Sequence, residues 1–165
     1  MARISAQDAG GQNVVAFLDM IAWSEVGADL LAKTDDGYNV VVGSTPDMPI
    51  VFLSYADHPH VVIEAAGGIP PSSAMGRYQI LRRYWDIYKP LLGATDFGPL
   101  WQDRYAIRQL KESGALPAVL DGRFEDAVGL CAHIWASLAG SQYGQHTNSM
   151  EVLKSVYEAK GGTAI

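Results

Sequence analysis

The first clear pattern along the chain is an apolar stripe with helical spacing near the N-terminus. Its members recur every three or four positions, and they are Val14, Phe17, Leu18, Ile21 and Ala22. This spacing predicts an amphipathic helix from about residue 14 to residue 27. Asp19 falls between the apolar positions, on the side of the helix that is expected to face solvent.

The next position of the same stripe carries a carboxylic acid, Glu25, four residues after Ile21. One interpretation is a solvated side chain at the frayed end of the helix. The other is a carboxyl group held beside apolar neighbours, where its pKa would rise because burial disfavours the ionised form. Such a group can donate a proton near neutral pH. The spacing leaves both interpretations open.

The pattern changes to short β-rich runs after this first helix. Residues 38–44 and 50–55 are rich in Val, Ile, Tyr and Phe, and turn residues at 45–49 separate them. These runs predict a small hairpin or sheet. Residues 60–76 begin in an extended pattern and continue into a loop rich in Gly and Pro, which is suited to a flap over a site.

Helical patterns return in the second half of the chain and occupy most of it. The predicted helices are 77–89, 99–114, 123–138 and 148–162. The first would place Tyr78 and Trp85 on one apolar face, and the last would open with a capping box from Asn148 to Glu151. Helices around a minor hairpin, without alternation of strands and helices, predict an α+β fold.

Length and composition indicate a globular chain. With 165 residues, 48% of them hydrophobic, we expect a flexible arm over 1–12 and a single domain over 13–165. A net charge of −6 argues against nucleic acid as a partner. No apolar run has the length of a membrane span or a secretory leader, so we expect a cytoplasmic protein without membrane insertion. The single cysteine, Cys131, has apolar neighbours at helical spacing and is interpreted as a core residue.

If Glu25 were the proton donor of a hydrolytic glycosidase, the site would usually need a second carboxylate as well. Asp35 and Asp36 are the nearest candidates in sequence, but they precede Gly37 and equally fit ordinary turn residues. A site with one carboxylate would suit a reaction in which a substrate hydroxyl replaces water as the attacking group.

The histidines allow a metal interpretation. His58 and His60 are two positions apart, whereas His133 and His146 lie far along the chain. A catalytic zinc needs three protein ligands and an open position, and no zinc-binding motif is present. We therefore expect no metal and no other cofactor.

Two polar stretches are further candidates for binding. Residues 72–79 include Tyr78 and Gln79 at a predicted junction of loop and helix, although a core position for Tyr78 is equally consistent. Residues 140–148 form a glycine-rich run with Tyr143 and Gln145, which also fits a solvated connector.

Several stretches taken together resemble the lambda-phage type of endolysin, a lytic transglycosylase. The matching stretches follow the order of that family and cover nearly the whole chain after the N-terminal arm. They are AFLDMIAWSE (16–25), GYNVVVG (37–43), DHP (57–59), GRYQIL (76–81), KESGALP (111–117), IWASL (134–138) and YGQ (143–145).

The resemblance implies a lysozyme-like α+β fold, with a mainly helical lobe, a small β-hairpin lobe and a cleft between them. Members of this family cut the β-1,4 bond between N-acetylmuramic acid and N-acetylglucosamine in peptidoglycan without water, and leave a 1,6-anhydromuramyl end. Glu25 falls on the single catalytic glutamate of the family. The resemblance therefore implies that it protonates the leaving oxygen and then accepts the proton of the C6 hydroxyl.

The resemblance also implies sugar contacts. Two loops that border the cleft in the family correspond to 61–72 and 139–148, and they suggest Tyr78, Gln79, Tyr143 and Gln145 as substrate-binding residues. One departure is Asn39, where the family relatives carry Asp, so no charge is expected at that position.

Two alternatives differ from this hypothesis in chemistry or in class. One is a muramidase that uses Asp35 or Asp36 to activate water. The other is a wall-binding module that holds glycan strands through aromatic residues and cuts nothing. On the leading hypothesis the protein is a monomer that binds peptidoglycan strands, waits in the host cytoplasm for a holin-type pore and then acts on the wall from the periplasm.

Overall fold

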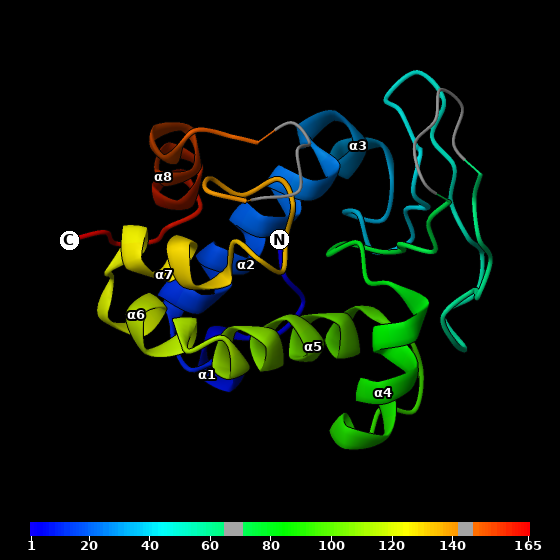
Figure 1. Ribbon diagram of the computed structural model, residues 1–165, viewed down its shortest axis with the longest axis horizontal. Coiled ribbons are helices and arrows are strands. Elements are labelled where there is room, and N and C mark those ends of the chain that lie inside the picture. Colours follow the sequence, from blue (N-terminus) through cyan, green and yellow to red (C-terminus); the bar gives the residue numbers. More distant parts are fainter. Residues whose placement is uncertain (65–70, 142–146) are drawn as a thin grey trace. The chain divides into compact units, whose positions relative to one another are not determined.

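The computed structural model describes residues 1–64, 71–141 and 147–165 (Figure 1). The chain divides into two compact units. Unit 1 combines Met1–Glu25 with Asp103–Ile165, and unit 2 is Val26–Gln102. The helices are α1 (Ala6–Ala9), α2 (Gln12–Val26), α3 (Ala28–Lys33), α4 (Arg82–Leu92), α5 (Pro99–Glu112), α6 (Ala115–Asp121), α7 (Phe124–Cys131) and α8 (Met150–Ala159).

The core of unit 1 is built around α2. Phe17 on this helix packs edge-on against Phe124 of α7 and Tyr157 of α8, with ring centroids 6.0 and 6.1 Å away. The rings of Phe124 and Tyr157 are themselves 5.0 Å apart. Helices α6 and α7 pack against each other, as Figure 1 shows. Residues 14–22 of α2 are all buried, so this helix is enclosed on every side and is not the amphipathic helix with a solvent-facing side that the spacing predicts.

The first twelve residues differ from the loose arm that the sequence predicts. They contain α1, and Ile4 is buried. The backbone N–H of Ala2 donates to Asp19 at 2.6 Å, and that of Ile4 donates to Asp103 at 2.9 Å. Asp19, expected to face solvent, is only 1% exposed, because it binds this returning segment. Helical periodicity cannot reveal a partner that arrives from outside the helix.

The β-rich part of unit 2 is less regular than predicted. The described residues form no extended strand, and the expected hairpin is reduced to isolated antiparallel bridges. One of them pairs Val40 with Val51, and the amide of Val41 donates to the carbonyl of Ile50 at 3.0 Å. The remaining bridges are Val41 with Met75, Thr45 with Met48, Ile63 with Ser72, and Met75 with Ile80.

The helix predicted from residue 77 begins five residues later, at Arg82. The preceding residues form a tight turn in which the amide of Ile80 donates to the carbonyl of Met75 at 2.8 Å. Gly76 has a φ of +76°, and a Cβ added there would lie 2.2 Å from Oε1 of Gln102. Tyr78 therefore lies in a turn and not on a helix face, because glycine allows a backbone conformation that ends the helical pattern.

The C-terminal helices follow the predicted stripes but differ at their ends. Helix α5 begins at Pro99 as predicted, whereas α7 ends at Cys131, seven residues before the predicted end at 138. The N-cap of α8 is Ser149, whose Oγ accepts a hydrogen bond from the amide of Val152 at 3.3 Å. Asn148, predicted to open the capping box, instead points its amide group toward α2.

The prediction that Cys131 is a core residue is confirmed. Its side chain is fully buried, and burial raises the pKa of the thiol to about 12. Across the ranges that the structure describes, no helix combines the length and apolar character needed to cross a membrane.

Candidate active site

Glu25 lies in the last turn of α2, at the end of the buried stripe. Its Oε1 accepts a hydrogen bond of 2.5 Å from the hydroxyl of Ser137 and a longer one of 3.3 Å from the backbone N–H of Ser137. Ser137 follows α7 in the loop that returns toward α8. The side chain of Glu25 is therefore held in place by a residue 112 positions away, unlike a frayed helix end.

The surroundings of Glu25 favour its protonated form. Burial raises the pKa of this carboxyl group above its usual range, while the hydroxyl and amide of Ser137 lower it in part. Burial is the larger effect, because it removes water from the charged form. A glutamic acid with a raised pKa can act as a proton donor near neutral pH.

Ser137 is a functional candidate that the sequence analysis missed. It belongs to a stretch that contributes to the resemblance, IWASL, but an isolated serine in a loop gives no local signal of function. Its importance follows from a contact between two segments far apart in the chain, and only a folded structure reveals that contact.

Asp35 and Asp36 are both engaged in the structure of unit 2. The hydroxyl of Tyr55 donates to Asp35 at 2.7 Å. The guanidinium of Arg77, only 1% exposed, lies 3.1 Å from a carboxylate oxygen of Asp36 and also donates to its backbone carbonyl. These contacts agree with the interpretation of both residues as parts of a turn before Gly37.

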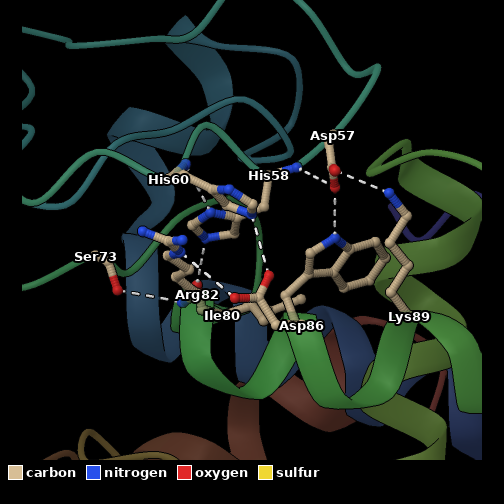
Figure 2. A network of polar contacts seen from close by, with 9 residues as sticks. Asp57, His58, His60, Ser73, Ile80, Arg82, Asp86 and Lys89 are labelled. Atoms are coloured by element: carbon tan, nitrogen blue, oxygen red, sulfur yellow. Dashed lines mark hydrogen bonds and ion pairs between the residues drawn. The ribbon is translucent and has the colours of Figure 1, made fainter.

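Figure 2 shows that His58 and His60 take part in a polar network beside α4. The Nδ1 atom of His58 accepts from the backbone N–H of His60 at 3.0 Å, and its Nε2 lies 3.0 Å from the carbonyl of Ile80. Nε2 of His60 lies 3.2 Å from Asp86. Burial lowers the pKa of His58, which favours the neutral ring.

The same contacts bear on the metal interpretation. Both ring nitrogens of His58 are directed at backbone groups, so this ring is held as a structural element. Of the four histidines, His146 lies outside the described residues. In the part of the chain that is described, no three side chains of His, Cys, Asp or Glu are grouped to hold a metal ion.

Asp57 is the centre of the network in Figure 2. It accepts hydrogen bonds from the indole N–H of Trp85 at 2.9 Å, from Lys89 at 2.8 Å and from the amide of His58 at 2.8 Å. Partial burial opposes ionisation, but these donors outweigh it and lower the pKa of Asp57 to about 2. The motif at 57–59 thus ties a loop to α4 through a carboxylate that stays charged at neutral pH.

The residues suggested as sugar contacts have different positions. Tyr78 is 1% exposed, so its side chain belongs to the core of unit 2. Gln79 is half-buried, has a φ of +48° and donates from its side chain to the carbonyl of Gly76 at 2.9 Å. Tyr143 and Gln145 lie outside the described residues.

Comparison with known proteins identifies the family and the fold of this chain. The family model described as Endolysin matches residues 15–164. The endolysin of Escherichia phage P2 is 42% identical over 157 residues, which cover 92% of this chain and 94% of that protein. The endolysin of Escherichia phage lambda is 42% identical over 149 residues, which cover 90% of each chain.

A solved structure gives the same result for the fold. The structure of bacteriophage lambda lysozyme complexed with a chitohexasaccharide has 38% sequence identity and a TM-score of 0.85, and the match covers 100% of both chains. The chain has a lysozyme-like fold and belongs to the endolysin family, whose members cleave peptidoglycan.

Proposed function

We propose that this protein is a lytic transglycosylase of a phage, and that it cleaves the MurNAc-β-1,4-GlcNAc bond with formation of a 1,6-anhydromuramyl end. The observation that carries the proposal is the state of Glu25, a single carboxyl group with a raised pKa at the end of a buried helix face. Family membership supplies the substrate class.

Glu25 has two roles in this reaction. Its protonated carboxyl group gives the proton to the glycosidic oxygen as the bond to C1 breaks, which leaves a carboxylate. The C6 hydroxyl of the same muramyl residue then attacks C1, and the carboxylate of Glu25 accepts the hydroxyl proton. The side chain returns to its initial state, and no water is consumed.

A second carboxylate is not required by this scheme. The alternative of a muramidase would need Asp35 or Asp36 to activate water, but these residues already bind Tyr55 and Arg77. Their engagement favours attack by the substrate hydroxyl over hydrolysis. A module that binds the wall without cutting it would have no use for a carboxyl group whose ionised form is disfavoured.

For substrate binding we assign different roles to the four candidates. Gln79 is our candidate sugar contact in unit 2, and the buried Tyr78 supports the turn on which Gln79 lies. Tyr143 and Gln145 stay candidate contacts on the strength of the family resemblance. Residues 13–165 form one catalytic domain on this proposal, and the cleft implied by the resemblance would hold the glycan strand.

The proposal also covers how the protein reaches the cell wall and in which oligomeric state it acts. The chain acts as a monomer on glycan strands in the periplasm, after a holin-type pore has let it out of the host cytoplasm. The proposed reaction uses no cofactor, because one carboxyl group and a substrate hydroxyl supply all proton transfers.

The decisive variant is Glu25→Gln, which keeps the shape of the side chain but cannot donate the proton. We expect cleavage of purified peptidoglycan to fall by about 10³-fold or more. Glu158→Gln, at an exposed position on α8, is the matched control and should cleave like the wild type. Because the raised pKa means that ionised Glu25 costs stability, Glu25→Gln should be at least as stable as the wild type at pH 8. Cleavage by a folded Glu25→Gln at the wild-type rate would disprove the assignment.

The products distinguish the two enzymatic mechanisms. Digestion in water enriched in heavy oxygen should give anhydro muropeptides without the label, detected by mass spectrometry. Fragments with a labelled reducing end would mean that water attacked, and would favour the muramidase.

A further inference from the structure

Ser137 is the last member of a row of hydrogen bonds that ends on Glu25. The side-chain amide of Asn148 donates to Oγ of Ser24 at 2.9 Å. The hydroxyl of Ser24 donates to Oγ of Ser137 at 2.7 Å, and the hydroxyl of Ser137 donates to Oε1 of Glu25 at 2.5 Å. These four residues all belong to unit 1.

The chemistry of the first group fixes the direction of the whole row. An amide nitrogen can only donate, so Oγ of Ser24 must accept from Asn148. A hydroxyl has one hydrogen, and that of Ser24 is directed at the closer acceptor, Oγ of Ser137, although the Ser137 carbonyl lies 3.2 Å away. The hydroxyl of Ser137 then has its own hydrogen left for Glu25.

The orientation of the Asn148 amide has independent support. Its nitrogen also lies 3.4 Å from the carbonyl oxygen of Ser137, and the backbone N–H of Asn148 donates to that same carbonyl at 2.9 Å. Turning the amide over would bring two oxygens together, which is unfavourable because neither can donate. The nitrogen therefore faces Ser24 and Ser137.

We infer that Asn148, Ser24 and Ser137 are positioning residues that keep Oε1 of Glu25 an acceptor and so hold its transferable proton on Oε2. This inference rests on the proposed role of Glu25 as the acid and base. The hydrogen bonds that the described residues make to Glu25 all fall on Oε1. A proton on Oε1 would face the hydrogen of the Ser137 hydroxyl, so the other oxygen carries it.

The row has a defined part in the proton balance of the reaction. When Oε2 gives its proton to the glycosidic oxygen, the bond to C1 breaks and the carboxyl group becomes negative. The short hydrogen bond from Ser137 strengthens as this charge develops. When Oε2 accepts the proton of the C6 hydroxyl, the charge disappears again. No proton travels along the row, because the amide of Asn148 neither releases nor accepts one.

The test is the titration of Glu25 in Ser137→Ala, followed by NMR of the carboxyl carbon in uniformly labelled protein. This variant keeps the hydrogen bond from the backbone amide of residue 137 to Glu25 but loses the one from the hydroxyl. The pKa of Glu25 is expected to rise by about one unit, because the hydroxyl bond stabilises the ionised form. The rate of cleavage should decline at a correspondingly higher pH. At pH 6 kcat should fall about tenfold while KM changes less than twofold, because the variant lacks the hydrogen bond that strengthens as the carboxylate forms, and one pKa unit corresponds to a tenfold change.

Three further variants keep this test specific. Ser137→Thr preserves the hydroxyl and should restore the wild-type titration. Ser24→Ala leaves the Ser137 hydroxyl free to turn, and should shift the titration in the same direction by a smaller amount. This variant serves as the test if Ser137→Ala does not fold. Ser155→Ala removes an exposed hydroxyl on α8 and should change nothing.

The outcomes separate this inference from the proposed function. An unchanged Glu25 titration and pH profile in folded Ser137→Ala and Ser24→Ala, with Glu25→Gln inactive, would overturn the role of the row and leave the function intact. Full cleavage by Glu25→Gln would overturn the function itself. Shifted titrations with restoration by Ser137→Thr would establish the row as we describe it.

Discussion

The interior of unit 1 and that of unit 2 both contain packed aromatic rings, but they differ in the buried polar side chains that accompany those rings. In unit 1 the centre is apolar, with Phe17, Phe124 and Tyr157 in mutual contact. In unit 2 fully buried polar side chains, among them Arg77 and Gln102, reach backbone groups of the irregular segments. In unit 2 these side chains satisfy buried backbone groups of segments that make only isolated bridges among the described residues, whereas in unit 1 the buried Asp19 and Asp103 bind the N-terminal segment.

The largest expected effect comes from the apolar core of unit 1. Phe17→Ala should lower the free energy of unfolding by about 4 kcal/mol, because it removes a fully buried ring that contacts two other aromatic rings. Urea denaturation followed by far-UV circular dichroism measures this loss. Leu130→Ala, at a side chain 44% exposed on α7, is the control and should cost less than about 1 kcal/mol. Equal losses for the two variants would contradict an apolar centre at Phe17.

A smaller loss of a different origin is expected for Gln102→Leu in unit 2. The side chain of Gln102 accepts from the amide of Arg77 and donates to the carbonyls of Tyr38 and Phe97. Leucine has a similar volume but leaves three buried backbone groups unsatisfied, so we expect a loss of about 3 kcal/mol in urea denaturation. Hydrogen exchange should accelerate at the amide of Arg77.

The control for this prediction is Gln7→Leu, at an exposed position of α1. It makes the same chemical change where water can replace the lost contacts, so stability should change by less than about 0.5 kcal/mol. If Gln102→Leu were as stable as the wild type, packing and not polar satisfaction would hold unit 2 together.

The smallest effect concerns the charge of Asp57 and depends on pH. Its pKa of about 2 in the folded protein lies below the unfolded value of 3.8, so its ionisation adds stability above pH 4. This contribution is lost as the pH falls from about 4 to 2. The carboxylate is 43% exposed, and solvent screening reduces the contribution to about 1 kcal/mol.

Asp57→Asn should therefore be less stable than the wild type at pH 7, and the difference should shrink toward pH 2. Urea denaturation at pH 2, 4 and 7 measures it. Asp121→Asn, at an exposed carboxylate in unit 1, is the control and should show no such trend. A constant difference for Asp57→Asn at all three pH values would rule out a role for its charge.

The same contrast explains which parts of the fold could be predicted from the sequence. Helices α2 and α5 could be predicted from apolar periodicity, although α2 is buried on every side over residues 14–22 and the expected solvent-facing side is absent there. The turn before α4 could not be predicted in this way. Tyr78 continues the helical pattern of its neighbours, but Gly76 and Gln79 adopt positive φ values and Met75 pairs with Ile80. The side chain of Gln102, remote in sequence, lies so close to Gly76 that a Cβ at this position would clash with it.

The residues of the candidate site also differ in whether they could be predicted from the sequence. Glu25 could be singled out because a carboxylate interrupts an apolar stripe, and the family resemblance gave it a role. Ser24, Ser137 and Asn148 could not be connected to it, since each of the three hydrogen bonds that form the row spans more than 100 residues. Hydrogen bonds between polar side chains that are far apart in the chain produce no periodic pattern in the sequence.

The buried thiol of Cys131 has a practical consequence for labelling experiments. With a pKa of about 12, only about one thiol in ten thousand is ionised at pH 8, and the side chain is fully shielded. Because it is the chain's single cysteine, maleimide or spin-label reagents should leave the natural protein unmodified. A cysteine introduced at an exposed position of either unit would then carry a fluorophore or spin label at one defined position, without removal of the native residue.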